Sequence, residues 1–224
     1  LAGRDLEANG TWMGTTRQVR FAAVTNFREA LPITASSLKS RGALVEAFLI
    51  GQTHPLAYAE HVSANADAYR GFNLLIGDKN TLVYVSNRGK KLTVLDAGIY
   101  GLSNHLLDTP WPKVNHRVAA FAQALAMDQG ELKNADQYLK VLADTRYASD
   151  HELPSTGVSK EWEKALSPAF IKTPSYGTRS STLLRVRKDG NFEMVERRFD
   201  ATGTVGHDVI TGALSTAPDS NLSV

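Results

Sequence analysis

Hydrophobic residues along the chain follow two different periods, which separate predicted strands from predicted helices. Near the start, β-branched and aromatic residues flank a short polar break, and this pattern predicts a β-hairpin over residues 11–25. Apolar residues then recur at helical spacing over residues 40–50, where Gly51 ends the pattern, and again from Pro55 to about residue 69. The chain therefore begins with a hairpin and two helices that we expect to pair.

From residue 72 the pattern changes to short apolar runs separated by polar turns, which is typical of a β-meander. The predicted strands of this meander are residues 72–76, 81–85, 92–95 and 99–102. Helical spacing returns next, and the predicted helices are residues 118–125, 132–142 and 160–166. A last hairpin pairs residues 180–186 with 192–199, because Asp189-Gly190 between them favours a tight turn.

Each of these elements has one apolar side, and the expected fold is the arrangement that buries all of those sides. We predict an α+β fold, a four-layer αββα sandwich in which two stacked, mostly antiparallel sheets lie between helical layers. No repeat or linker divides the pattern, so we expect one domain over residues 1–200. The remaining residues 201–224 are polar and poor in aromatic residues, which predicts a flexible tail.

Composition and charge exclude several classes of protein. The 224 residues are 42% hydrophobic and 21% charged, as in ordinary soluble globular proteins. The 25 Lys and Arg against 23 Asp and Glu leave a net charge of +2, too small to imply a nucleic-acid or membrane surface. No apolar stretch approaches the roughly 18 residues of a membrane-spanning helix, and the first residues lack the pattern of a signal peptide. We expect a soluble cytoplasmic protein that binds a small molecule, without a nucleic-acid partner or a membrane span, and with its oligomeric state open.

The lack of cysteine, the spacing of the histidines and the lack of common catalytic motifs exclude further kinds of functional site. The chain has no Cys, which excludes disulfides, thiolate metal sites and a cysteine nucleophile within these residues. Its six His residues lack metal-ligand spacing, and no nucleophile elbow, phosphate-binding loop or dinucleotide fingerprint is present. We therefore expect neither a metal nor a cofactor. Arg185 and Arg187 alternate onto one face of the last hairpin, and we interpret that face as solvated.

Three polar residues at strand ends are the candidates for chemistry. Asn26 and Asn104 each end a predicted strand, and Arg179 opens another. An Asn at such a position is often a turn former, and this interpretation stays open. Alternatively, the three converge on one pocket, where side-chain amides stabilise an oxyanion and a guanidinium orients a carboxylate.

Eight segments, in this order, make the chain similar to one known family. They are LAGRD (1–5), GTWMG (10–14), RFAAVTNFR (20–28), SRG (40–42), GFNLL (71–75), YGLSN (100–104), TPWPK (109–113) and YGTRSST (176–182). In these segments the chain resembles the NRDE family, also called the TANGO2 (transport and Golgi organisation 2) family, from Leu1 to about Phe199. The resemblance implies an αββα sandwich of the N-terminal-nucleophile (Ntn) hydrolase type.

The start of the chain departs from this family. Members usually begin Met-Cys, so that Cys becomes the first residue, and they carry an Asn-Arg-Asp-Glu motif before the point where this chain starts. We therefore expect an N-terminally truncated domain whose cysteine nucleophile is absent from the 224 residues. In the related choloylglycine hydrolases and acyltransferases, the terminal thiol attacks an amide carbonyl and its own α-amino group acts as the base.

The resemblance also implies roles for single residues. Asn26 and Asn104 would hold the oxyanion or position the substrate, and Arg179 would orient the surroundings of the nucleophile. Four further residues of the same motifs are predicted substrate contacts: Asp5, Trp12, Arg28 and Tyr176.

Two functions follow from these expectations. The first is a hydrolase or acyltransferase that, in its full-length form, acts on C–N amide or acyl bonds of a small molecule. The alternative is a non-catalytic carrier of haem, acyl-CoA or another lipid in the same pocket, as in haem or lipid trafficking. Its first contacts to test are His54, His61, His105 and Tyr176. A Met-Cys encoded upstream would favour catalysis over carriage.

Overall fold

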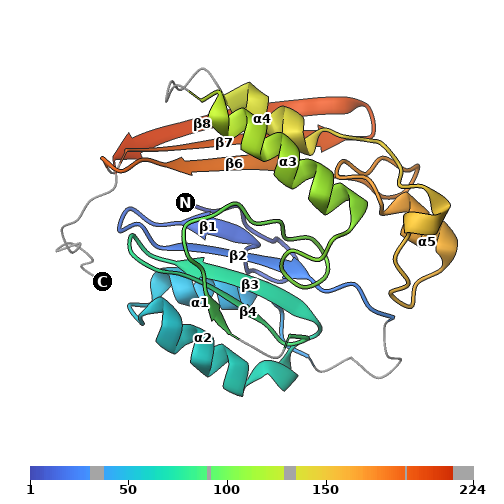
Figure 1. Ribbon diagram of the computed structural model, residues 1–224. Helices are drawn as coiled ribbons and strands as arrows, with labels where there is room; N and C mark the ends of the chain where they lie inside the picture. The colour runs from blue at the N-terminus through green and yellow to red at the C-terminus, as the bar shows by residue number, and fades with distance from the viewer. Residues whose placement is uncertain (31–37, 90–91, 129–134, 190, 214–224) are drawn as a thin grey trace. The chain divides into compact units, whose positions relative to one another are not determined.

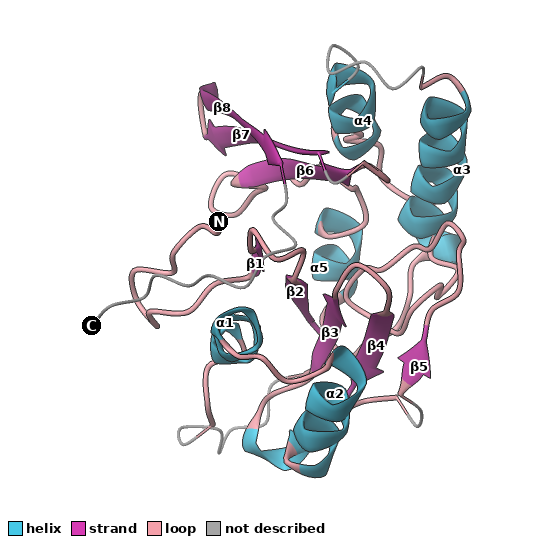
Figure 2. Cartoon of the chain, turned by 90° about the vertical axis from the view of Figure 1, so that its left-hand side faces the viewer, coloured by secondary structure: helices cyan, strands magenta, loops and turns pink. Residues whose placement is uncertain are grey.

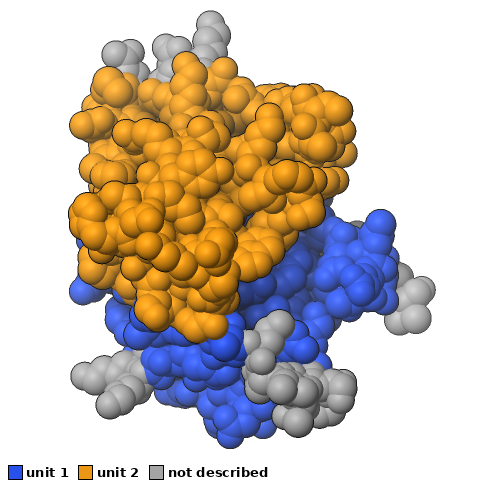
Figure 3. Space-filling view, turned by 90° about the vertical axis from the view of Figure 1, so that its right-hand side faces the viewer, with its two compact units in different colours: residues 1–98, 102–107, 214–224 blue, residues 99–101, 108–213 orange. Residues whose placement is uncertain are grey.

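The computed structural model describes residues 1–30, 38–89, 92–128, 135–189 and 191–213. Over these residues the chain forms two compact units, which Figure 3 shows in different colours. Unit 1 spans Leu1–Gly98 and Leu102–Leu107, and unit 2 spans Ile99–Gly101 and Asp108–Ala213. Each unit has its own antiparallel sheet with helices against one face.

Unit 1 is built on a sheet whose strands lie in the order β1-β2-β3-β4-β5. The strands are β1 (Met13–Thr15), β2 (Phe21–Asn26), β3 (Phe72–Gly77), β4 (Leu82–Ser86) and β5 (Thr93–Val94), and each pair of neighbours is antiparallel. Helices α1 (Gly42–Ile50) and α2 (Pro55–Ala64) cover one face of this sheet (Figure 1), and a short 3₁₀ helix, η1 (Ala66–Ala68), follows α2.

The core of unit 1 lies between these helices and the sheet. Alternate residues of a strand point to the same face, so β2 contributes Ala22 and Val24, and β3 contributes Phe72, Leu74 and Ile76. The helices and β4 add Leu44, Val45, Phe48, Ala59, Val62, Val83 and Val85 to the same cluster. Fully burying one such large apolar side chain contributes about 1.5–3 kcal/mol, so this face of the sheet and the helices are held together mainly by hydrophobic burial.

Two glycines of the N-terminal motifs are required by a close crossing of the backbone. A Cβ atom on Gly10 would lie 2.7 Å from the carbonyl carbon of Gly42, at the start of α1. In the other direction, a Cβ atom on Gly42 would lie 3.1 Å from the amide nitrogen of Thr11, which donates to the Gly42 carbonyl at 3.4 Å. Packing therefore explains why glycine stands at both places, and it fixes where α1 begins beside β1.

Unit 2 is built on a sheet in the order β6-β7-β8, with antiparallel neighbours. Its strands are β6 (Ser180–Val186), β7 (Asn191–Asp200) and β8 (Gly203–Ala213), and its helices are α3 (Pro112–Ala126), α4 (Ala135–Leu142), η3 (Asp150–Glu152) and α5 (Lys160–Ala165). Figure 2 shows α3 and α4 against one face of the sheet. Apolar contacts there join Ala124, Tyr138 and Leu139 of the helices to Leu183 and Val195 of the strands.

The predicted α+β class with two antiparallel sheets is confirmed, and the two sheets with their helices are the elements that an αββα sandwich requires. Two local predictions were wrong. Residues 203–213, expected in the polar tail, form β8, while residues 214–224 of that tail lie outside the described residues. Residues 99–102 form no strand, so Asn104 lies in a loop rather than at a strand end.

Candidate functional site

Asn26 and Asn104 lie together in unit 1, although 78 residues separate them in the sequence. Asn26 is the last residue of β2, and Asn104 belongs to the loop Leu102–Leu107. The side-chain amide of Asn104 donates to the backbone carbonyl of Asn26, with 3.0 Å between Nδ2 and the oxygen. The backbone N–H of Arg28 in turn donates to the carbonyl of Asn104 at 2.7 Å. Both Asn residues are thus held at the end of one strand.

A buried set of polar side chains positions this loop. Asn73 of β3 is fully buried, and its Nδ2 donates to the carbonyl of His105 at 2.9 Å and to Thr25 Oγ1 at 3.1 Å. The hydroxyl of Thr25 donates onward to the carbonyl of Ser103 at 3.0 Å. Three side chains form what we call the Asn73 network: Thr25, Asn73 and Tyr84. It connects β2, β3 and β4 to the loop that carries Asn104.

Tyr84 completes the hydrogen bonds of this network. Its hydroxyl donates to Asn73 Oδ1 at 2.8 Å and accepts from the backbone N–H of Leu107 at 3.1 Å. Burial raises the pKa of Tyr84 above its ordinary value, although the hydrogen bond from Leu107 works in the opposite direction. Sequence reasoning missed the network. The available signal was Asn73 itself, a single amide inside the otherwise apolar strand Phe72–Gly77.

The other predicted contacts of unit 1 have different roles. Trp12 is 43% exposed, and the Arg41 guanidinium carbon lies 5.7 Å from the centroid of its ring. Arg28 is buried, and its backbone anchors Asn104 as described. Asp5 has a local structural role, because its Oδ1 accepts from the backbone N–H groups of Glu7 and Ala8 at 2.9 and 3.1 Å.

A cluster of charges surrounds Gly71, immediately before β3. Arg41 Nη1 donates to the Gly71 carbonyl at 3.1 Å, and the Gly71 N–H donates to Glu29 Oε1 at 3.1 Å. Arg88 binds the two oxygens of Glu29 at 2.7 and 2.8 Å, and this hydrogen bonding lowers the pKa of Glu29. Burial, and then the nearby charge of Arg70, lower the pKa of Arg41. A Cβ atom on Gly71 would lie 2.6 Å from Glu29 Oε1 and 2.9 Å from the Cβ atom of Phe27, so a side chain there would force both neighbours to shift.

Arg179 and Tyr176 belong to unit 2. Arg179 directly precedes β6, as predicted, and its carbonyl accepts from the N–H of Phe199 at 2.8 Å. Tyr176 closes a turn with Thr173, whose hydroxyl donates to the Tyr176 carbonyl at 2.7 Å, and its ring lies edge-on to Trp162 at 6.2 Å. The structure thus brings Asn26 and Asn104 together within unit 1, and the convergence of Arg179 with them stays a prediction.

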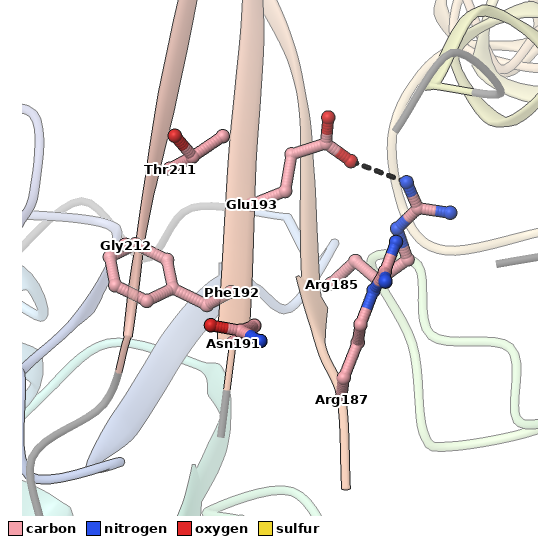
Figure 4. A pocket seen from close by; sticks show the side chains of 7 residues that line it. All are labelled: Arg185, Arg187, Asn191, Phe192, Glu193, Thr211 and Gly212. Carbon is pink, nitrogen blue, oxygen red and sulfur yellow. Dashed lines mark hydrogen bonds and ion pairs between the residues drawn. The ribbon is translucent and has the colours of Figure 1, made fainter. Parts of the chain in front are cut away.

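Unit 2 contains a pocket of about 290 Å³ at the end of its sheet (Figure 4). It is lined by polar and charged residues and one aromatic ring: Arg185, Arg187, Asn191, Phe192, Glu193, Thr211 and Gly212. Arg185 binds Glu193 at 2.6 Å and Asp128 at 2.8 Å, and its side chain is only 14% exposed. The predicted solvated face was therefore wrong for Arg185. Burial alone would lower the pKa of Arg185, but the two carboxylates raise it above its ordinary value.

Two of the histidines in the described ranges, His54 and His105, make local contacts within unit 1. His54 caps α2, because its Nδ1 accepts from the N–H of Leu56 at 3.3 Å. The ring of His105 lies 4.7 Å from that of Phe27, and burial lowers its pKa. Among the described residues, no three or more His, Cys, Asp or Glu side chains are placed to hold a metal ion. In the same part of the chain, no helix combines the length and the apolar character needed to cross a membrane.

Fold and site together define an α+β protein in which the side-chain amide of Asn104 contacts the backbone of Asn26 at one end of an antiparallel sheet. The sequence model of the Transport and Golgi organisation 2 (TANGO2) family matches residues 1–201. A mouse (Mus musculus) relative, Transport and Golgi organization 2 homolog, is 31% identical over 213 residues, which cover 88% of this chain and 76% of the relative. Bovine (Bos taurus) and human (Homo sapiens) relatives, named Transport and Golgi organization protein 2 homolog, are each 32% identical with the same coverage. The chain belongs to the TANGO2 family.

Proposed function

We propose that this protein, in a form that supplies a nucleophile, is an Ntn-hydrolase-like hydrolase or acyltransferase acting on a C–N amide or related acyl bond of a small molecule. The observation that carries the proposal is the contact of Asn104 with the end of β2, where the side-chain Nδ2 of Asn104 donates to the backbone carbonyl of Asn26 at 3.0 Å. Side-chain amides placed in advance at one point are suited to stabilising the oxyanion that develops on an attacked carbonyl.

The two amides differ in how firmly they are held. Asn104 has its side chain bonded to the Asn26 carbonyl and its own carbonyl bonded to the N–H of Arg28, so little reorganisation is needed when a ligand binds. The side chain of Asn26 is exposed, and within the described ranges its amide makes no hydrogen bond. We infer that Asn26 provides the group that adapts to the ligand, while Asn104 provides the fixed one.

The proposed reaction begins with a thiolate that attacks the acyl carbon of the substrate. The thiol proton passes to the α-amino group of the same residue, and the two amides stabilise the negative oxygen of the tetrahedral intermediate. Collapse of the intermediate breaks the C–N bond, the amine leaves with the proton, and water or an acceptor then releases the acyl group. Since the 224 residues contain no Cys, this mechanism places the nucleophile before Leu1, and it gives Arg179 the role of orienting that nucleophile.

The test uses the chain with the reading frame that precedes Leu1 in the gene. Turnover is measured on a panel of small amides and thioesters for the unmodified protein and for Asn104→Ala. If Asn104 is an oxyanion donor, kcat falls about a hundredfold or more while the melting temperature changes little. Asn80→Ala, in the exposed turn between β3 and β4, is the matched control. Equal turnover in the protein and in Asn104→Ala would overturn the proposed role.

One observation favours a second function, carriage of a ligand without turnover. Trp12 is exposed beside Arg41, which offers an apolar surface and a cation to a ligand such as haem or an acyl-CoA. The chain also has no Cys of its own. Under this alternative, Asn104→Ala alters ligand affinity modestly, and neither the unmodified protein nor Asn104→Ala turns over any compound of the panel. Absorbance titration with haem and calorimetry with an acyl-CoA measure that affinity directly.

A further inference from the structure

Strand β8 forms one edge of the sheet of unit 2. The strand order is β6-β7-β8, and among the described segments only β7 pairs with β8. Helix α4 covers β6 and β7 instead, because Leu139 packs with Leu183 of β6 and Val195 of β7. Figure 2 shows β8 at the edge of the sheet away from α4. Within the described part of the chain, the outer edge of β8 therefore has no strand beside it.

The alternation of backbone hydrogen bonds identifies the groups of β8 that lie on this outer edge. The N–H of Arg187, directly after β6, donates to the carbonyl of Asn191 in β7 at 2.9 Å. In this register the odd-numbered residues of β7 bond to β6, so its even-numbered residues bond to β8. Ile210 lies opposite Met194 and thus bonds to β7. The backbone N–H and C=O groups that point away from β7 belong to alternate residues of β8: His207, Val209 and Thr211.

β8 lacks most of the features that keep edge strands from pairing. Natural edge strands are often very short, or they carry Lys, Pro or a bulge. β8 has eleven residues, and its shift of register opposite Arg198 and Phe199 lies near its start. Asp208 is its only charged residue and already binds Arg198 at 2.9 Å. Val209 and Ile210, on opposite faces, are 53% and 41% exposed, so apolar side chains accompany the backbone groups of this edge.

A second copy of β8 is complementary to this edge. Two copies related by a two-fold axis perpendicular to the sheet run antiparallel, and each residue then lies opposite a residue of the same face. Centring the pair on Asp208 would place two carboxylates opposite each other, which is destabilising. Centring it on Val209 avoids this, because Val209 then meets its own copy. In that register His207 lies opposite Thr211, and Asp208 lies opposite the uncharged Ile210.

We propose that β8 is a homodimer interface, in which two copies of this chain pair antiparallel through their β8 strands, centred on Val209, and join their sheets into one. Main-chain hydrogen bonds across the two edges supply the affinity, and the exposed valines meet at the centre. The family model matches residues 1–201 and β8 begins at Gly203, so the interface lies beyond the matched residues. The dimer uses none of the residues of the proposed reaction, and it forms whether or not the protein turns over a substrate.

Sedimentation equilibrium of the 224-residue chain over a wide range of concentration tests the dimer. We expect a reversible monomer–dimer equilibrium, and we expect Val209→Lys to raise its dissociation constant about tenfold or more, because two ammonium groups would lie opposite each other. Val94→Lys is the matched control, since Val94 is 50% exposed and lies in β5, the edge strand of unit 1. A monomer at every concentration overturns the proposal, and so does a dimer that the two substitutions weaken equally.

Hydrogen exchange of the unmodified chain shows what lies beside the edge, without a substitution that could disturb the fold. The amide of Val209 points to the outer edge, whereas the amide of Ile210 bonds to β7. We expect protection of the Val209 amide to increase with protein concentration, while the Ile210 amide is protected throughout. A Val209 amide that is protected in the monomer would mean that a segment of the same chain occupies the edge. That result overturns the proposal, as does an unprotected Val209 amide in the dimer.

Single cysteines test the register, because the chain has no Cys of its own. Val209→Cys places two thiols on directly opposed residues, whose Cα atoms would lie about 5.5 Å apart, within the range of a disulfide. Ile210→Cys is the matched control, since its two copies would be diagonal neighbours about 7–8 Å apart, beyond that range. We expect oxidation to link Val209→Cys into a covalent dimer at least about tenfold faster than Ile210→Cys. Equal or reversed rates overturn the pairing centred on Val209.

Discussion

Unit 1 and unit 2 both bury polar groups to connect a strand with a distant segment, but they do so with different chemistry. In unit 1 the Asn73 network is neutral, and each donor meets an acceptor at 2.8–3.1 Å. In unit 2 the connection is charged, because Arg185 binds Asp128 and Glu193, and Tyr138 donates to Asp128 at 2.6 Å. The first connection carries the loop of Asn104, and the second borders the pocket of Figure 4.

Because of this difference, we expect substitutions in the two units to lower the free energy of unfolding by different amounts. A neutral buried network that loses one member leaves unsatisfied donors and acceptors, at about 1–3 kcal/mol each. A charged cluster that loses its cation leaves buried carboxylates, which is costlier because a buried charge has no substitute for water. The following changes test the comparison, from the largest expected effect to the smallest.

Arg185→Ala should be the most damaging change. It leaves the carboxylates of Asp128 and Glu193, whose side chains are 8% and 4% exposed, without their cation. We expect the free energy of unfolding to fall by about 3–5 kcal/mol in urea denaturation. The control is Arg198→Ala, because the Arg198 and Asp208 side chains are about half exposed, and its loss should stay within about 1 kcal/mol. Equal losses in the two variants would show that the Arg185 cluster is not effectively buried.

Asn73→Ala should come second. The substitution removes the partner of three groups, the His105 carbonyl and the hydroxyls of Thr25 and Tyr84, and we expect a loss of about 2–3 kcal/mol. Hydrogen exchange of the Leu107 amide should accelerate, because its acceptor Tyr84 loses its own partner. Unchanged protection of that amide would contradict a positioning role for Asn73, and Asn80→Ala serves as the exposed control.

Tyr138→Phe should have the smallest effect at neutral pH, about 1 kcal/mol for the lost hydrogen bond to Asp128. Burial, followed by that hydrogen bond, raises the pKa of Tyr138 to about 12. The pKa of Tyr138 is thus higher in the folded state than in the unfolded state, where it lies near 10. The resulting contribution to stability is fully present below pH 10 and is lost as the pH rises through 12. The unmodified chain should therefore lose stability more steeply than Tyr138→Phe between pH 10 and 12. Parallel curves in urea denaturation over that range would contradict the shift.

The last hairpin and β8 show where sequence reasoning succeeds and where it fails. Asp189-Gly190 and the alternating apolar residues around it were enough to predict β6 and β7, because turn chemistry and side-chain period act over a few residues. β8 was missed, since most of its side chains are exposed and it lacks an apolar face to detect. Its pairing with β7, from Asn191 opposite Ala213 to Asp200 opposite Gly203, is made by the backbone, which every sequence has.

Residues 99–102 illustrate the opposite error. Their apolar character predicted a strand, but Gly101 lies so close to α3 that a Cβ atom on it would be 2.5 Å from Val114. The segment is instead held by side chains, because Asp108 Oδ1 accepts from the N–H of Gly101 at 2.7 Å. Tertiary packing outweighed the local preference there.

The sequence by itself determined the family, the alternation of strands and helices, and the two Asn residues that became candidates. Only the tertiary structure decided that Asn104 meets Asn26, that Asn73 holds the loop of Asn104, and that Arg41 lies beside Trp12. The physical reason is the distance along the chain over which each kind of interaction acts. Periodicity and turn chemistry depend on neighbours within a few residues, whereas a hydrogen bond across 78 residues depends on strand register, loop path and the burial of every group between.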